Sequence, residues 1–218
     1  MDDLTTKRNP TSHDLSDPER LAALVTSRLC HDLISPLGAI GNGLELLQMA
    51  GGLRSGPDSP EMALISDSVD ASRARLRWFR IAFGPVAPEQ RSSLTEMAAL
   101  LADMERGGRL RVRIDAEGDM PRIEARMILL GLMCLETALP WGGSILVCRG
   151  AVGWRLVAEA ARTRPDPALW SWLDAAAGRE LPAPSPSEVH FPVFATLSAR
   201  EARPISWELD EKGGEISF

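Results

Sequence analysis

The chain has 218 residues, of which 44% are hydrophobic and 25% charged, and its formal net charge is -6. This composition predicts a globular protein with a sizeable core, and the acidic balance argues against a nucleic-acid-binding surface, which is normally basic. Residues 1–14 lack the apolar core of a signal peptide, and no apolar stretch is long enough to span a bilayer. We therefore expect a cytoplasmic protein that binds neither nucleic acid nor a membrane.

Two long helices are predicted after a polar, disordered tail over residues 1–16. The first begins at Asp17, a suitable N-cap followed by proline at the first helical position, and ends before Gly51-Gly52. Pro36 should bend it, because proline removes a backbone hydrogen bond. The second runs from Ser59-Pro60-Glu61 to Gly84-Pro85. Apolar residues recur at steps of three and four along the first helix: Leu21, Val25, Leu29, Leu33, Leu37, Ile40, Leu44 and Leu47.

These helices predict a long antiparallel hairpin over residues 17–84. Two helices alone bury little apolar surface, and the usual solution is to pair two hairpins across a two-fold axis. We therefore expect a homodimer built on a four-helix bundle.

A linker over residues 85–92 should separate the hairpin from an α+β domain over residues 93–218. The pattern predicts a largely antiparallel sheet. The expected helices are Thr95–Arg106, Pro121–Ala138, Pro167–Ala177 and Ser187–Ala202, the last disturbed near Pro192. The expected strands are Leu110–Asp115, Ser144–Arg149, Trp154–Ala160, Pro204–Leu209 and Glu215–Phe218.

One segment of the first helix is chemically specific. His31 lies about 160° around the helix from Leu33, at about 100° per residue, so it should point to solvent. Its face also carries Ser35, Gly38 and Asn42, and the small residues leave room for another protein. A neutral imidazole is a good phosphoryl acceptor near neutral pH. We expect His31 to be the nucleophile, with Asp32 orienting the ring or accepting its proton and Arg28 steadying the phosphoryl oxygens.

The segment around His31 resembles the H-box of two-component histidine kinases, in which an acidic residue and a later proline follow the histidine. The longer run RLCHDLISPLGAIGNGLELL resembles the ChpT family of bacterial histidine phosphotransferases, as do WFRIAFG at 78–84 and ALPWGG at 138–143. The resemblance implies a dimeric hairpin joined to a degenerate ATPase-like α/β sandwich. It also implies that His31 carries the phosphoryl group, Asp32 is its acidic partner and Pro36 is the bend.

The same resemblance implies the partners. They would be receiver domains of a hybrid kinase and of response regulators, including a CtrA-type transcription factor. We expect Mg²⁺ to be held by the partner receiver rather than by this chain, which should bind no metal of its own.

A kinase of this type would bind ATP through paired asparagines in the long helix and through glycine-rich loops. Leu130 and Cys134 appear at the asparagine positions, and Asp166 is not followed by glycine. We therefore expect an ATPase-like shape without a nucleotide site. Two other functions stay open, namely an active kinase with a divergent ATP site and a receiver-binding scaffold that never carries phosphate.

Overall fold

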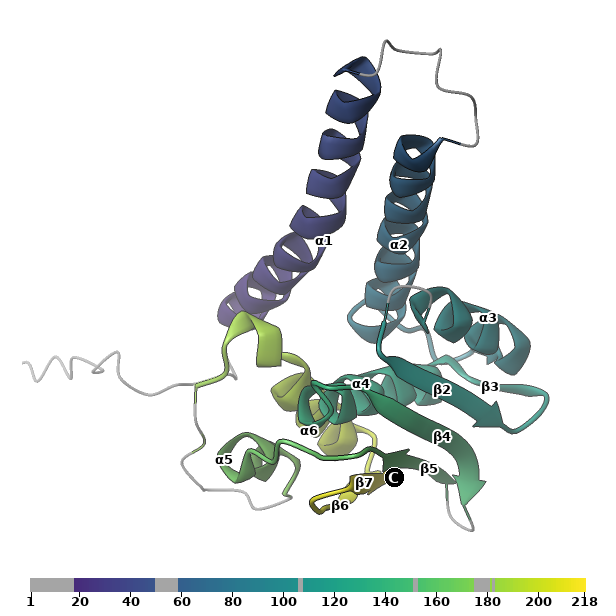
Figure 1. Cartoon of the computed structure of the whole chain (residues 1–218). Coiled ribbons are helices and arrows are strands. Elements are labelled where there is room, and N and C mark those ends of the chain that lie inside the picture. Colours follow the sequence, from purple (N-terminus) through teal and green to yellow (C-terminus); the bar gives the residue numbers. More distant parts are fainter. Residues whose placement is uncertain (1–17, 50–58, 106–107, 151–152, 175–180, 182) are drawn as a thin grey trace, which may run out of the picture.

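The computed structural model describes residues 18–49, 59–105, 108–150, 153–174, 181 and 183–218. The predicted tail over residues 1–16 and the Gly51-Gly52 stop lie outside these residues. The two predicted long helices are present as α1 (Pro18–Met49) and α2 (Pro60–Ala82), which stand side by side as a hairpin (Figure 1). The Ser59 hydroxyl caps α2 by accepting from the Met62 N–H at 3.3 Å, as the sequence predicts.

Glycine sets how closely the two hairpin helices approach. Gly43 of α1 is buried, and a Cβ at this position would lie 2.6 Å from Cγ1 of Ile65 on α2. The helices diverge from there toward the rest of the molecule (Figure 1). Pro36 lies inside α1, which continues through it as helix.

The C-terminal unit is α+β, as expected. It contains a five-stranded sheet in the order β2 (Leu110–Asp115), β4 (Gly143–Gly150), β5 (Gly153–Glu159), β7 (Gly213–Ser217) and β6 (Ser206–Leu209). The β2–β4 pairing is parallel and the other three pairings are antiparallel. Residues 151–152, between β4 and β5, are not among the described residues.

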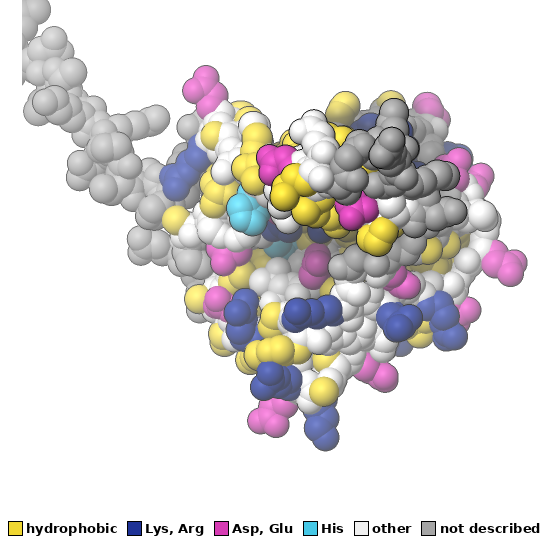
Figure 2. Space-filling model, turned by 45° about the horizontal axis from the view of Figure 1, so that its top comes forward, with side chains coloured by type: hydrophobic (Ala, Val, Ile, Leu, Met, Phe, Trp, Pro, Cys, Tyr) yellow, Lys and Arg dark blue, Asp and Glu magenta, His cyan; other side chains and the backbone are white. Residues whose placement is uncertain are grey.

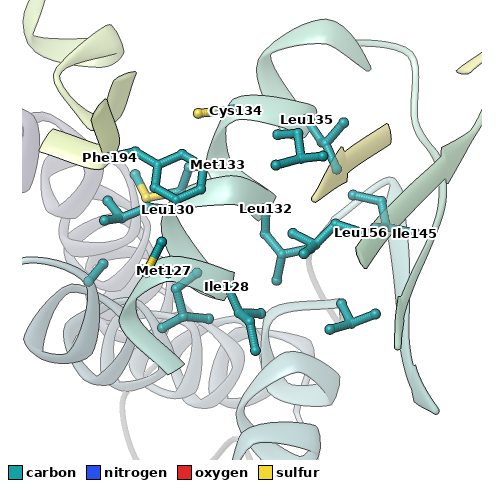
Figure 3. Close-up of a cluster of buried hydrophobic side chains, with 14 of the residues drawn as sticks. Met127, Ile128, Leu130, Leu132, Met133, Cys134, Leu135, Ile145, Leu156 and Phe194 are labelled. Atoms are coloured by element: carbon teal, nitrogen blue, oxygen red, sulfur yellow. The ribbon is translucent and has the colours of Figure 1, made fainter. Parts of the chain in front are cut away.

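Helices cover one face of this sheet and hold the core. They are α3 (Leu94–Glu105), α4 (Arg122–Ala138) and α6 (His190–Arg200). α4 is almost entirely buried, and its Gly131 allows close packing: a Cβ there would lie 3.0 Å from Leu156 of β5 and 3.6 Å from Phe194 of α6. Figure 3 shows these side chains around α4.

Several predicted bounds were wrong. The helix expected over 167–177 is only α5 (Pro167–Trp170) followed by the 3₁₀ turn η2 (Ser171–Leu173), with residues 175–180 undescribed. The helix expected from Ser187 begins at His190, after the 3₁₀ turn η3 (Pro186–Glu188). Pro192 therefore falls in the first turn, where its missing N–H costs no hydrogen bond.

A second, two-stranded sheet was not predicted. It pairs β1 (Arg91–Ser93) with β3 (Asp119–Pro121), and strands of three residues are too short to show an alternating pattern. β1 lies partly within the predicted linker.

The hairpin and the C-terminal unit share one hydrophobic core. Trp78, Phe79 and Ala82 at the end of α2 are buried in the same cluster as α4. Arg126 of α4 donates to the carbonyls of Ala82 at 2.9 Å and Gly84 at 3.3 Å, which satisfies carbonyls at the end of α2. The base of the hairpin is therefore fixed to the unit that follows it.

Candidate functional site

His31 is displayed on the surface of α1. Its side chain is 81% exposed, as its helical phase predicts, while that of the neighbouring Asp32 is only 12% exposed. His31 Nδ1 lies 3.2 Å from Asp32 Oδ1. A carboxylate only accepts hydrogen bonds, so a neutral His31 ring that makes this contact carries its proton on Nδ1 and has a free lone pair on Nε2. An imidazole in this state is ready to act as a nucleophile through Nε2.

Asp32 is held on its other side by Arg28, one helical turn earlier. Arg28 Nε donates to Asp32 Oδ2 at 2.8 Å, and another nitrogen of the same guanidinium donates to the backbone carbonyl of Ser187 in η3. The Arg28 side chain is 13% exposed. Its guanidinium contacts these two acceptors on the inner side of α1, whereas His31 projects outward.

A cleft of about 630 Å³ opens beside Asp32, between the diverging hairpin helices and the C-terminal unit. Of the predicted site residues, Asp32, Ser35 and Pro36 line this cleft. Gly38 and Asn42 are exposed outside it, and open space surrounds Gly38, as expected for a face that leaves room for a partner.

The cleft also contains charged residues of both signs. Arg75 of α2 and Arg109, just before β2, line it together with Asp67, Glu105 and Glu136. Arg75 belongs to a basic run in α2, whereas Arg109 carries no sequence signal and is brought in only by the fold. Figure 2 shows one face of the molecule, on which Lys and Arg side chains are spread among Asp and Glu side chains.

Two residues of α4 that bear on the question of ATP binding lie inside the core. Leu130 and Cys134 are both 0% exposed, and α6 packs over this part of α4 (Figure 3). Burial raises the pKa of the Cys134 thiol well above its usual value, so it stays neutral. Asp166 accepts from the Leu169 N–H at 3.1 Å and so caps α5.

Two negative findings concern the described residues only. No cluster of three or more His, Cys, Asp or Glu side chains among them has the arrangement needed to hold a metal ion. None of the helices in the described ranges combines the length and the hydropathy required to cross a membrane.

The fold and the site together define a class: a helical hairpin with an exposed histidine, joined to an α/β sandwich whose long helix is buried. A family model described as the histidine phosphotransferase C-terminal domain matches residues 94–213. The chain therefore belongs to the histidine phosphotransferase family.

Individual relatives agree with this assignment. The protein phosphotransferase ChpT of Brucella abortus (strain 2308) is 38% identical over 130 residues, which are 58% of this chain and 59% of that protein. A solved bacterial phosphotransferase is 29% identical with a TM-score of 0.74, covering 92% of this chain and 96% of its own.

Proposed function

We propose that this protein is a histidine phosphotransferase of a two-component phosphorelay. It accepts a phosphoryl group on His31 from a receiver-domain aspartate and passes the group to the aspartate of another receiver. The observation that carries this proposal is the exposed imidazole whose Nδ1 faces Asp32. The family of the chain supports the same role.

The transfer step follows from the geometry at His31. The Nε2 lone pair attacks the phosphorus of an aspartyl phosphate, the P–O bond to the aspartate breaks, and the aspartate leaves as a carboxylate. Asp32 stabilises the positive charge that develops on the ring through the Nδ1 proton. The reverse reaction delivers the group to a second receiver. Phosphoryl transfer of this kind depends mainly on position and charge, so few side chains are needed.

The cleft beside Asp32 is the proposed docking place for the receiver. A receiver placed there would meet Arg75 and Arg109 as well as carboxylates such as Asp67 and Glu136. The support for this docking place is therefore its position beside Asp32 and not its net charge. The carboxylates of the receiver would hold Mg²⁺, and this chain would supply no metal ligand. With receivers of this kind as partners, the proposed location of the reaction is the cytoplasm.

ATP plays no part in the proposed activity. Nucleotide binding would need polar side chains on the exposed face of α4, and Leu130 and Cys134 are apolar or neutral and buried. An asparagine at either position would have its amide inside the core, which is unfavourable without hydrogen-bond partners.

The proposed active form is a homodimer. Large apolar side chains on the hairpin stay exposed in the single chain: Ile34 at 67%, Leu37 at 58%, Leu44 at 49% and Leu76 at 46%. Leu37 and Leu44 belong to the apolar stripe that predicts a bundle, and a second hairpin would cover them.

The dimer is tested by placing charges on this stripe. The double substitution of Leu37→Glu and Leu44→Glu should give a monomer in analytical ultracentrifugation, because paired carboxylates would be buried at the interface. Gln90→Glu, at an exposed position before β1 and outside the hairpin, should remain a dimer. A wild-type chain that sediments as a monomer at micromolar concentration would contradict the expectation.

The phosphotransfer is tested with candidate receiver domains carrying ³²P on their aspartate. Label should appear on the wild-type protein in an acid-labile, base-stable form and should be absent from His31→Ala. Gln48→Ala serves as the control and should be labelled like the wild type. Label passing to His31→Ala would refute the assignment of His31.

Two related measurements distinguish the two other functions, with ATP as the donor of the label in one and receiver binding as the readout in the other. Direct labelling of His31 from ATP would identify a kinase. Receiver binding without any label on His31 would identify a scaffold.

A further inference from the structure

Arg28 connects the two halves of the molecule at the site. Its guanidinium contacts Asp32 on its own helix and the carbonyl of Ser187 in η3, 159 residues later in the chain. An exposed ion pair four residues apart on a helix contributes only a few tenths of a kcal/mol. Here both side chains are nearly buried, at 13% and 12% exposed, and a third partner lies outside the helix.

The carbonyl of Ser187 is a fixed acceptor. The Ser185 N–H donates to the Glu188 carboxylate at 2.8 Å within a capping box, and the hydroxyls of Ser185 and Ser187 are 2.7 Å apart. Val189 and His190 follow directly and are buried in the core of the C-terminal unit. The turn is therefore anchored, and it holds the Arg28 guanidinium in place.

The two oxygens of Asp32 are divided between two partners. Oδ2 accepts from Arg28 and Oδ1 accepts from His31 Nδ1. Rotation of the carboxylate would break the contact to Arg28, so the guanidinium fixes the orientation in which Asp32 meets the imidazole.

We propose that Arg28 is a positioning residue for phosphotransfer, and that the turn Pro186–Glu188 belongs to the site through it. By orienting Asp32, Arg28 keeps the His31 proton on Nδ1 and the Nε2 lone pair available. This proposal rests on the proposed role of His31. It also gives the C-terminal unit a part in the chemistry, in addition to docking a partner.

The first test measures the tautomer of His31 in the unphosphorylated full-length protein by two-bond ¹H–¹⁵N NMR. The wild type should show the Nδ1–H form. Arg28→Gln should shift His31 toward a mixture with the Nε2–H form and slow phosphoryl transfer about 10- to 100-fold, the cost of a small misplacement. Arg28→Lys, a single charge that lacks the planar fork, should restore the tautomer in part.

Two further variants distinguish the positioning role of Arg28 from the effect of an ordinary ion pair within one helix. Arg73→Gln removes an exposed pair with Asp70 on α2 and should leave both the tautomer and the rate unchanged. Glu188→Ala removes the capping box and leaves the sequence of α1 unchanged. It should shift the His31 tautomer and the transfer rate in the same direction as Arg28→Gln does. Circular dichroism confirms that each variant is folded.

The proposal is overturned if Arg28→Gln behaves like Arg73→Gln in both readouts. It is also overturned if transfer slows while the His31 tautomer is unchanged, because Arg28 would then act directly on the phosphoryl group. A shift of the tautomer with no change in the rate of transfer would overturn it as well. Label transfer to His31→Ala, in contrast, would refute the proposed function, while the NMR measurement would still report whether Arg28 orients Asp32.

Discussion

The two described histidines have opposite environments. His31 is exposed, whereas His190 is 1% exposed, with Nε2 3.2 Å from the Thr137 hydroxyl. Burial, and secondarily the positive charge of Arg28, lowers the pKa of His190 from 6.5 to about 3. His190 is therefore neutral at physiological pH and links α6 to α4 as part of the core.

This environment predicts an acid sensitivity of folding. Below pH 6.5 the unfolded chain binds a proton at His190, whereas the native protein binds this proton only when the pH falls to about 3. The free energy of unfolding is therefore not reduced by this titration above pH 6.5. Below that pH it decreases by about 1.4 kcal/mol per pH unit, because protons bind to the unfolded chain.

Urea unfolding of the wild type and of His190→Gln at pH 7 and pH 4.5 checks this expectation. The wild type should lose about 2–3 kcal/mol more than the variant over this range. The exposed-site control His31→Gln should follow the wild type. Equal losses for wild type and His190→Gln would show that His190 is protonated in the native state.

At the residue scale, the sequence predicts contacts within one helix better than contacts across the fold. The exposure of His31 follows from its phase relative to Leu33, and Asp32 is adjacent to it. The contact of Arg28 with Ser187 depends on where η3 lies, and no local pattern encodes a backbone carbonyl 159 residues away. The same applies to Arg109, which reaches the cleft only through the placement of β2.

At the element scale, α4 is joined to the sheet and to the chain after α6 by a buried carboxylate. Glu124 accepts from the Trp154 indole N–H of β5 at 2.7 Å and from Arg203 at 2.9 Å, and it is 8% exposed. Glu124→Ala should lower the free energy of unfolding by about 2–3 kcal/mol, because it leaves an indole N–H and a guanidinium without their acceptor.

Denaturant unfolding measures this effect. Glu124→Gln, which keeps an acceptor for Trp154, should cost less than the alanine variant. Glu117→Ala, at an exposed position before β3, should change the free energy by about 0.5 kcal/mol or less. If Glu124→Ala lowers the free energy of unfolding no more than Glu117→Ala does, then water replaces the hydrogen bonds of Glu124 with Trp154 and Arg203.

Long, periodic elements were predictable and short ones were not. α4 was expected from its continuous apolar pattern, and β2 from strict alternation of apolar residues, which are half-buried in the structure, with polar residues, which are exposed. β1 and β3 have three residues each, and η2 and η3 also have three. Elements of this length are fixed by tertiary contacts, which explains why Pro167–Ala177 was predicted as one longer helix.

At the scale of the whole molecule, the linker predicted over residues 85–92 does not separate two independent cores. Trp78 of α2 is 6% exposed and belongs to the cluster around α4. Trp78→Ala should therefore destabilise the C-terminal unit as well as the hairpin, by about 3–5 kcal/mol.

Unfolding followed by far-UV circular dichroism tests the shared core. The wild type should show one transition, and Trp78→Ala should shift the whole of it. Arg80→Ala, two residues later and exposed, should shift it little. Loss of the hairpin alone, with the transition of the C-terminal unit unchanged, would show that the two parts are stable independently.

The close approach of α1 and α2 at Gly43 limits which residues can be introduced at this position of the hairpin. Gly43 is twelve residues after His31, about 18 Å along the helix axis at 1.5 Å per residue. Since the helices separate from that pivot toward their base, a side chain at residue 43 would act as a wedge and alter the opening far from it. The separation of α1 and α2 that a partner protein would meet near their base therefore depends on a distant position, because residue 43 is a glycine and lacks the methyl group of alanine.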